Sequence, residues 1–108
     1  MKIDVYGIQE KAPVKAPVKI YCDDKELVEV PRGGKVVIDV PEGSFLKFRV
    51  KKMEAGCDAI GSSVVLSWNY EANLLLAFAT NNPDRTNEWL NAETKKNGLF
   101  YFLRLLFG

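Results

Sequence analysis

Cations recur at every second position in residues 45–51, which read FLKFRVK. This spacing places Lys47, Arg49 and Lys51 on one face of a β-strand, with Phe45 beside them. Basic and aromatic side chains on an open β-surface are the means by which OB-type folds hold single-stranded nucleic acid. The three cations are therefore a candidate ligand or partner surface. A solvated outer sheet face explains the same pattern without a ligand and is the commoner case.

Histidine is absent from the chain, and cysteine occurs only as Cys22 and Cys57. Ser-His-Asp and Cys-His nucleophilic systems need an imidazole, and tetrahedral zinc sites usually take four Cys or His ligands. We therefore expect no catalytic residue of these kinds, no metal and no cofactor. We expect Cys22 in the core. Cys57 is expected in an exposed loop, where a reactive thiolate would need a neighbouring cation. A disulfide between the two remains open.

Two short polar segments resemble binding motifs. The acidic group Asp23, Asp24 and Glu26 offers oxygen ligands for calcium, but the loop and flanking helices of an EF-hand are missing. Residues 32–35, RGGK, lack the frame of a phosphate-binding loop and the helix that follows it. Both segments are predicted to be turns. A carboxylate pair of a small hydrolase or isomerase cannot be assigned from sequence and stays as a third alternative.

Alternation of apolar and polar residues predicts a series of short strands. Those at 18–51 are joined by tight turns and predict a meander, whereas residues 52–63 are predicted to be a loop. The last two strands are expected to pair as an antiparallel hairpin. The predicted strands are residues 2–8, 18–22, 26–30, 35–40, 45–51, 64–68 and 74–80. The side chains predicted to share one core are Leu46, Phe48, Val50, Leu66, Trp68, Leu76 and Phe78.

Two segments depart from the strand pattern. Asn82 followed by Pro83 is an N-cap signal, which predicts a short helix over residues 83–95. Residues 11–19 contain the repeat KAPVKAPVK. Prolines four apart remove backbone donors and favour extended geometry, so this stretch is expected to be a stiff linker or sheet-edge segment.

The overall composition is that of an ordinary globular domain, with 47% hydrophobic and 27% charged residues in 108. A formal charge of +1 provides no global field for polyanions or membranes. We predict a single domain over residues 1–108, mainly β, built as an antiparallel β-sandwich of six to eight short strands with one short helix. No apolar run reaches the roughly 20 residues of a transmembrane helix, which favours a cytoplasmic location.

The C-terminal stretch LFYFLRLLF, residues 99–107, is apolar at every position except Arg104. As a strand it would present apolar side chains on both faces, and a domain of this size struggles to cover both. Phe100, Phe102 and Leu106 form one of these faces, so we predict that they make the interface of a homodimer. The sequence does not decide between strand and helix for this stretch.

Residues 18–51 resemble the small bacterial β-domains called PEGA domains. The matching pieces are IYCDDK at 20–25, an Asp-rich turn after a strand, and PEGS at 41–44 before a strand of alternating apolar and basic residues. This resemblance implies a surface or interaction module with no catalytic residues. Our hypothesis is a non-enzymatic interaction or assembly module that self-associates. The alternative is a nucleic-acid-binding OB-like β-barrel that uses the basic strand face.

Overall fold

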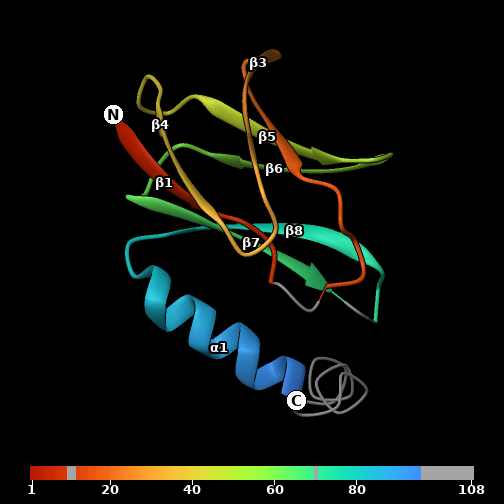
Figure 1. Cartoon of the computed structure of the whole chain (residues 1–108). Helices are drawn as coiled ribbons and strands as arrows, with labels where there is room; N and C mark the ends of the chain where they lie inside the picture. Colours follow the sequence, from red (N-terminus) through yellow and green to blue (C-terminus); the bar gives the residue numbers. More distant parts are fainter. Residues whose placement is uncertain (10–11, 70, 96–108) are drawn as a thin grey trace.

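The computed structural model describes residues 1–9, 12–69 and 71–95, and side chains as far as residue 90. In this part of the chain, eight strands form two four-stranded sheets, with one helix outside them (Figure 1). The fold is mainly β and is compatible with the predicted β-sandwich. The elements are β1 (Lys2–Tyr6), β2 (Val18–Cys22), β3 (Lys25–Val30), β4 (Lys35–Asp39), β5 (Phe45–Val50), β6 (Met53–Asp58), β7 (Ser63–Asn69), β8 (Leu74–Thr80) and α1 (Pro83–Lys95).

The strand order differs from the predicted meander. One sheet has the order β4-β1-β7-β8 and is called the β1 sheet; the other has the order β3-β2-β5-β6 and is called the β5 sheet. Strands β2 and β3 form a hairpin as expected, but β4 leaves it and pairs with β1 instead. Strand β5 then returns beside β2. Strand β1 also pairs with β7, and this pairing is parallel. The prediction of consecutive pairing over residues 18–51 was therefore wrong.

The segment predicted as a loop, residues 52–63, contains strand β6. This strand pairs with β5 along its whole length, from Phe45 opposite Asp58 to Val50 opposite Met53. Its sequence, MEAGCD, contains one glycine, one alanine and two carboxylates, residues of low β-propensity. Pairing with β5 and contact with the core by Ala55 and Cys57 override that local preference.

The core lies between the sheets and consists of the inward-facing residues of the strands. Leu46, Phe48 and Val50 of β5 are buried as predicted, and so are Leu66 and Trp68 of β7. The prediction for β8 was wrong by one residue. The fully packed side chain there is Leu75, opposite Trp68, with Ala77 opposite Leu66. Leu76 and Phe78 lie on the outer face. The prediction missed this because a run of three leucines has no alternation of apolar and polar residues from which the inward phase could be read.

Helix α1 begins at Pro83 as predicted, is described as far as Lys95, and covers the outer face of the β1 sheet beside β7 and β8 (Figure 1). It begins where expected, because the amide of Arg85 donates to Oδ1 of Asn82 at 3.2 Å. Trp89 meets Phe78 edge to face, with ring centroids 6.4 Å apart. The helix explains why Val65 and Ser67, which point away from the core, are nevertheless buried. No described helix is both long enough and apolar enough to cross a membrane.

The chain between β1 and β2 is fastened to the body by polar contacts. Gln9 accepts a hydrogen bond from the amide of Trp68 at 3.0 Å and donates to its carbonyl oxygen at 3.1 Å, so the amide side chain extends the ladder of β7. Arg32 donates to the carbonyl of Ala12 at 2.9 Å. Ala12 and Val14 are buried while Pro13 and Lys15 are exposed, so this part of the proline-containing segment covers the core.

Candidate interaction surfaces

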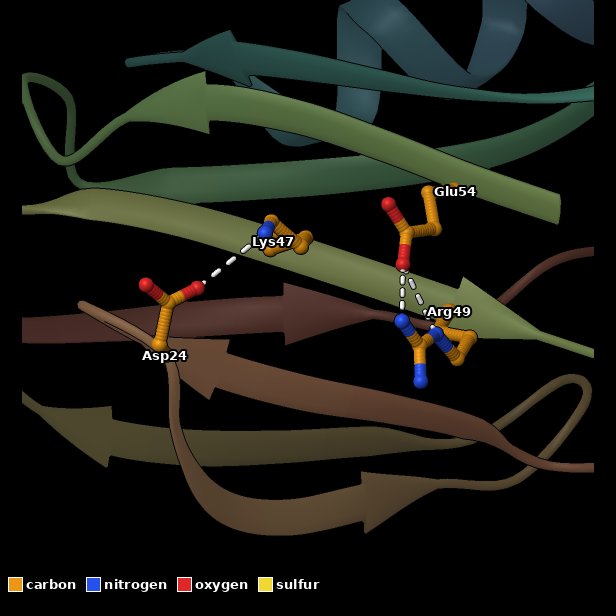
Figure 2. Close-up of polar contacts among 4 residues, drawn as sticks. All are labelled: Asp24, Lys47, Arg49 and Glu54. Atoms are coloured by element: carbon orange, nitrogen blue, oxygen red, sulfur yellow. Dashed lines mark hydrogen bonds and ion pairs between the residues drawn. The ribbon is translucent and has the colours of Figure 1, made fainter.

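The predicted cationic face is the outer face of the β5 sheet, where two of the three named side chains lie side by side. Lys47 and Arg49 point away from the core, because Leu46, Phe48 and Val50 occupy the inward phase of the same strand. Nζ of Lys47 lies 3.1 Å from Oδ1 of Asp24, and Nε of Arg49 donates a hydrogen bond to Oε1 of Glu54 at 2.8 Å (Figure 2). Nη2 of Arg49 donates to the same carboxylate oxygen.

Lys51, the third predicted cation, is not part of strand β5. Strand β5 ends at Val50, and Lys51 lies in the turn to β6 with φ 55°. The alternation in FLKFRVK continues one residue beyond the strand, which is why the sequence included it. Residues with positive φ are usually Gly, Asn or Asp, so the Lys51-Lys52 pair carries no recognisable turn signal.

Carboxylates from neighbouring strands and from the β2–β3 turn neutralise the cations of this surface. Besides the two ion pairs above, Lys19 on β2 lies 3.9 Å from Glu26 on β3. The pKa of Arg49 is raised by its hydrogen bond and charge interaction with Glu54, and the pKa of Glu54 is lowered by the same hydrogen bond. The cations are therefore matched by local acids and do not form a positive field.

Two aromatic rings also lie on the outer face of the β5 sheet. The guanidinium of Arg49 lies 5.6 Å from the centroid of the Tyr21 ring. Phe45 lies over Gly56 of β6, where an added Cβ would come within 2.5 Å of the ring. The glycine leaves the space that the Phe45 ring fills, although 48% of Phe45 stays exposed. Phe45 was predicted on this face, but its partner Gly56 was not, because the residues of β6 were predicted as a loop.

The cysteines are free and lie on different strands. Cys22 is buried, as predicted, whereas Cys57 is on β6 and not in an exposed loop. Both are opposite Leu46, one on each side, so their Cα atoms are separated by two strand spacings, roughly 9 to 10 Å. A disulfide cannot span that distance. Burial, with a smaller effect from Asp58, raises the pKa of Cys57 to about 11, which opposes a thiolate role.

The acidic segment after β2 is a tight turn, as predicted, in which Asp23 and Asp24 have φ of 48° and 68°. Within the described residues, no group of three or more His, Cys, Asp or Glu is arranged to hold a metal ion. The second segment, residues 32–35, also contains a turn, at Arg32 and Gly33, and Lys35 is the first residue of β4. Its Gly33 and Gly34 make backbone contacts with Ile8 and Gly7, so this loop fastens the end of β1.

A third surface, which sequence analysis missed, lies on the edge strands β3 and β4 of the two sheets. Strand β4 ends the β1 sheet and β3 ends the β5 sheet, and the two strands are joined by the short segment 31–34. Both edge strands carry exposed apolar side chains, namely Val37 on β4 at 56% exposure and Leu27 and Val28 on β3 at just under 40%. The opposite side, where β6 lies against β8, is lined by the small residues Ala55, Cys57 and Ala77, which pack on the core. The sequence contains a signal for the exposed Val37: residues 36–38 read VVI, so this strand has apolar side chains on both of its faces.

The predicted dimer interface at Phe100, Phe102 and Leu106 lies outside the described residues. It stays a prediction from the sequence alone.

Comparison of the chain with protein-family models, with curated proteins and with solved structures finds no match.

Proposed function

We propose that this domain is a non-enzymatic interaction or assembly module that self-associates. The observation that carries the proposal is the exposed apolar side chains on the edge strands β3 and β4, of which Val37 on β4 is more than half exposed. An outermost strand presents unpaired backbone donors and acceptors, and apolar side chains beside such an edge favour pairing with another chain. The resemblance of residues 18–51 to PEGA domains agrees with this role.

The ionisable groups of the β5 sheet also support a non-catalytic role. Acid–base or nucleophilic catalysis needs a group whose pKa is tuned towards neutrality. Here the pKa of Glu54 moves down and that of Cys57 moves up, both away from neutral pH. These shifts suit an ion pair and a packed thiol. A cytoplasmic location is part of the same proposal, since both cysteines are free thiols.

Sedimentation equilibrium at tens of micromolar tests self-association. We expect a mass above that of the monomer. A purely monomeric mass over this range would remove self-association from the proposal. The double variant F100S/F102S then tests the predicted C-terminal interface: an unchanged mass would place the contact elsewhere on the domain.

The alternative function is nucleic-acid binding through Lys47 and Arg49, favoured by the adjacent Tyr21 ring. Fluorescence polarisation with short single-stranded oligonucleotides at low salt tests it. Binding that weakens steeply with salt, and that a variant with Lys47, Arg49 and Lys51 replaced by Gln loses while it stays folded, would support this alternative. No signal from the native protein at low salt would eliminate it.

A further inference from the structure

Among the described residues, strand β4 has a free edge whose backbone geometry can be assigned residue by residue. The amide of Gly7 donates to the carbonyl of Gly34 at 2.8 Å, and the amide of Val40 donates to the carbonyl of Met1 at 3.0 Å. The backbone N–H and C=O groups of the even-numbered residues of β4 and its flanks therefore point towards β1. Because alternate residues of an antiparallel strand direct their polar groups to opposite sides, Lys35, Val37 and Asp39 direct theirs away from β1. Among the described strands, β4 pairs with β1 alone.

The side chains of the same three residues lie on the outer face of the sheet. Their register partners on β1 are Tyr6 for Lys35, Asp4 for Val37 and Lys2 for Asp39. All three are exposed, in contrast to Ile38, which faces the core. Strand β4 therefore presents a stripe that reads cation, valine, anion, with the donor and acceptor groups of these residues at the free edge.

This stripe is complementary to itself when reversed. A second β4 laid antiparallel and centred on Val37 places Lys35 opposite Asp39, Val37 opposite Val37, and Asp39 opposite Lys35. These are the residues whose backbone groups face the free edge, so each pair can exchange two N–H···O bonds. Shifting the centre to Val36 or Ile38 places a charged residue opposite valine and breaks both ion pairs. All three registers keep odd-numbered residues opposite one another, so the backbone phase permits each of them and the charges select the one centred on Val37.

We propose that a second copy of this chain occupies the free edge of β4, pairing as its own β4 in an antiparallel arrangement centred on Val37. The inference rests on the proposed self-association and names the surface that performs it. It joins two β1 sheets into one continuous eight-stranded sheet with a two-fold axis at Val37. Such an isologous contact is the commonest way in which identical chains associate.

Neighbouring groups are compatible with this arrangement. The amino group of Met1 lies 3.3 Å from Oδ1 of Asp39, but the carboxylate side chain is 73% exposed and can accept a further hydrogen bond. Lys35 lies 5.7 Å from the centroid of the Tyr6 ring on the same face. The strand has no bulge in its register with β1, whereas β3 has a register shift and the charged residues Lys25, Glu26 and Glu29. Bulges and charges protect an edge from pairing, which makes β4 the more open of the two.

A charge exchange tests the register directly by sedimentation equilibrium of the full chain. Lys35→Asp alone, or Asp39→Lys alone, replaces two attractive cross-strand pairs by two repulsive ones. We expect each to raise the dimer dissociation constant roughly tenfold or more, since every change acts twice across the axis. The double variant K35D/D39K restores opposite charges at both pairs and should recover the dimer. Far-UV circular dichroism of each variant shows whether the monomer fold is kept.

Cross-linking supplies a second, independent test. Directly opposed residues that exchange both hydrogen bonds have Cα atoms about 5.5 Å apart, within the range of a disulfide. Val37→Cys should therefore form an intermolecular disulfide under mild oxidation. The matched control is Ile60→Cys, at an exposed position in the β6–β7 loop, which should remain largely unlinked, as should the wild-type chain with its own thiols.

The outcomes separate this inference from the proposed function. A monomeric wild-type chain contradicts self-association itself and with it the β4 pairing. A wild-type dimer that all three charge variants leave unchanged contradicts the β4 pairing alone and leaves self-association to another surface. Loss of the dimer in both single variants with recovery in the double variant supports both.

Discussion

Truncation of Phe48 measures how much of the stability depends on the inward phase of β5. Phe48 is fully buried in the centre of that strand, between Ile20 on β2 and Ala55 on β6. Phe48→Ala removes the ring and leaves a cavity that two packed sheets cannot close. We expect a loss of about 3 to 5 kcal/mol in the free energy of unfolding. That is a large share of the roughly 5 to 15 kcal/mol of a domain of this kind.

Urea unfolding monitored by circular dichroism is the assay. With a slope of about 1 to 3 kcal/mol per molar for a small protein, the midpoint should fall by roughly 2 M. The matched control is Phe45→Ala on the same strand. Phe45 has the opposite phase and is about half exposed, so solvent fills the space left by its ring. There we expect a loss of only about 1 to 2 kcal/mol from lost burial.

The comparison between the two phenylalanines carries the test. Equal midpoint shifts, or a larger shift for Phe45→Ala, would refute the assigned inward phase of β5. A Phe48→Ala variant already unfolded in buffer still agrees with the reasoning, provided that Phe45→Ala is folded under the same conditions.

Further predictions concern a close contact, an ion pair and a thiol. Gly7→Ala should lower the free energy of unfolding by about 3 kcal/mol, since the new Cβ would lie 2.2 Å from the carbonyl oxygen of Pro31; a thermal midpoint within a degree of wild type would contradict this. Arg49→Gln should raise the pKa of Glu54 towards its ordinary 4.5 in an NMR titration, and an unchanged pKa would refute the pairing. Because the ion pair lowers the pKa of Glu54 in the folded state, its contribution to stability is complete above the pKa of the unfolded state. That contribution is lost as the pH falls through the pKa of the folded state. Cys57 should react with a disulfide reagent at a rate rising roughly tenfold per pH unit until pH approaches 11; a plateau near pH 9 would show an ordinary thiol.

The sequence predicted local structure well where one signal dominated. The start of helix α1 was predicted because Asn82 and Pro83 mark it. The inward phase of β5 was clear because Lys47 and Arg49 alternate with apolar residues. Strand β8 has no such alternation at residues 74–76, so its phase could be set only by pairing with Trp68 and the other residues of β7.

Pairing between distant strands was beyond the sequence. No local feature of β4 shows that it pairs with β1 and not with β3, because its residues suit either neighbour. The cationic face was recognised, but its neutralisation depends on Glu54, which comes from a strand that composition did not reveal. The self-complementarity of β4 likewise became visible only when the structure showed that this strand ends its sheet.

The position of β1 has a consequence for how the chain folds during synthesis. This strand precedes the other described strands, yet it lies inside its sheet, with β4 on one side and β7 on the other. Its pairing with β7 joins Asp4 to Ser63, so the contact closes only after more than half of the sequence has left the ribosome. Until then one edge of β1 lacks its final neighbour. Because the entropy of loop closure over such a separation must be lost before packing gives any gain, we expect the β1 sheet to be completed late in folding.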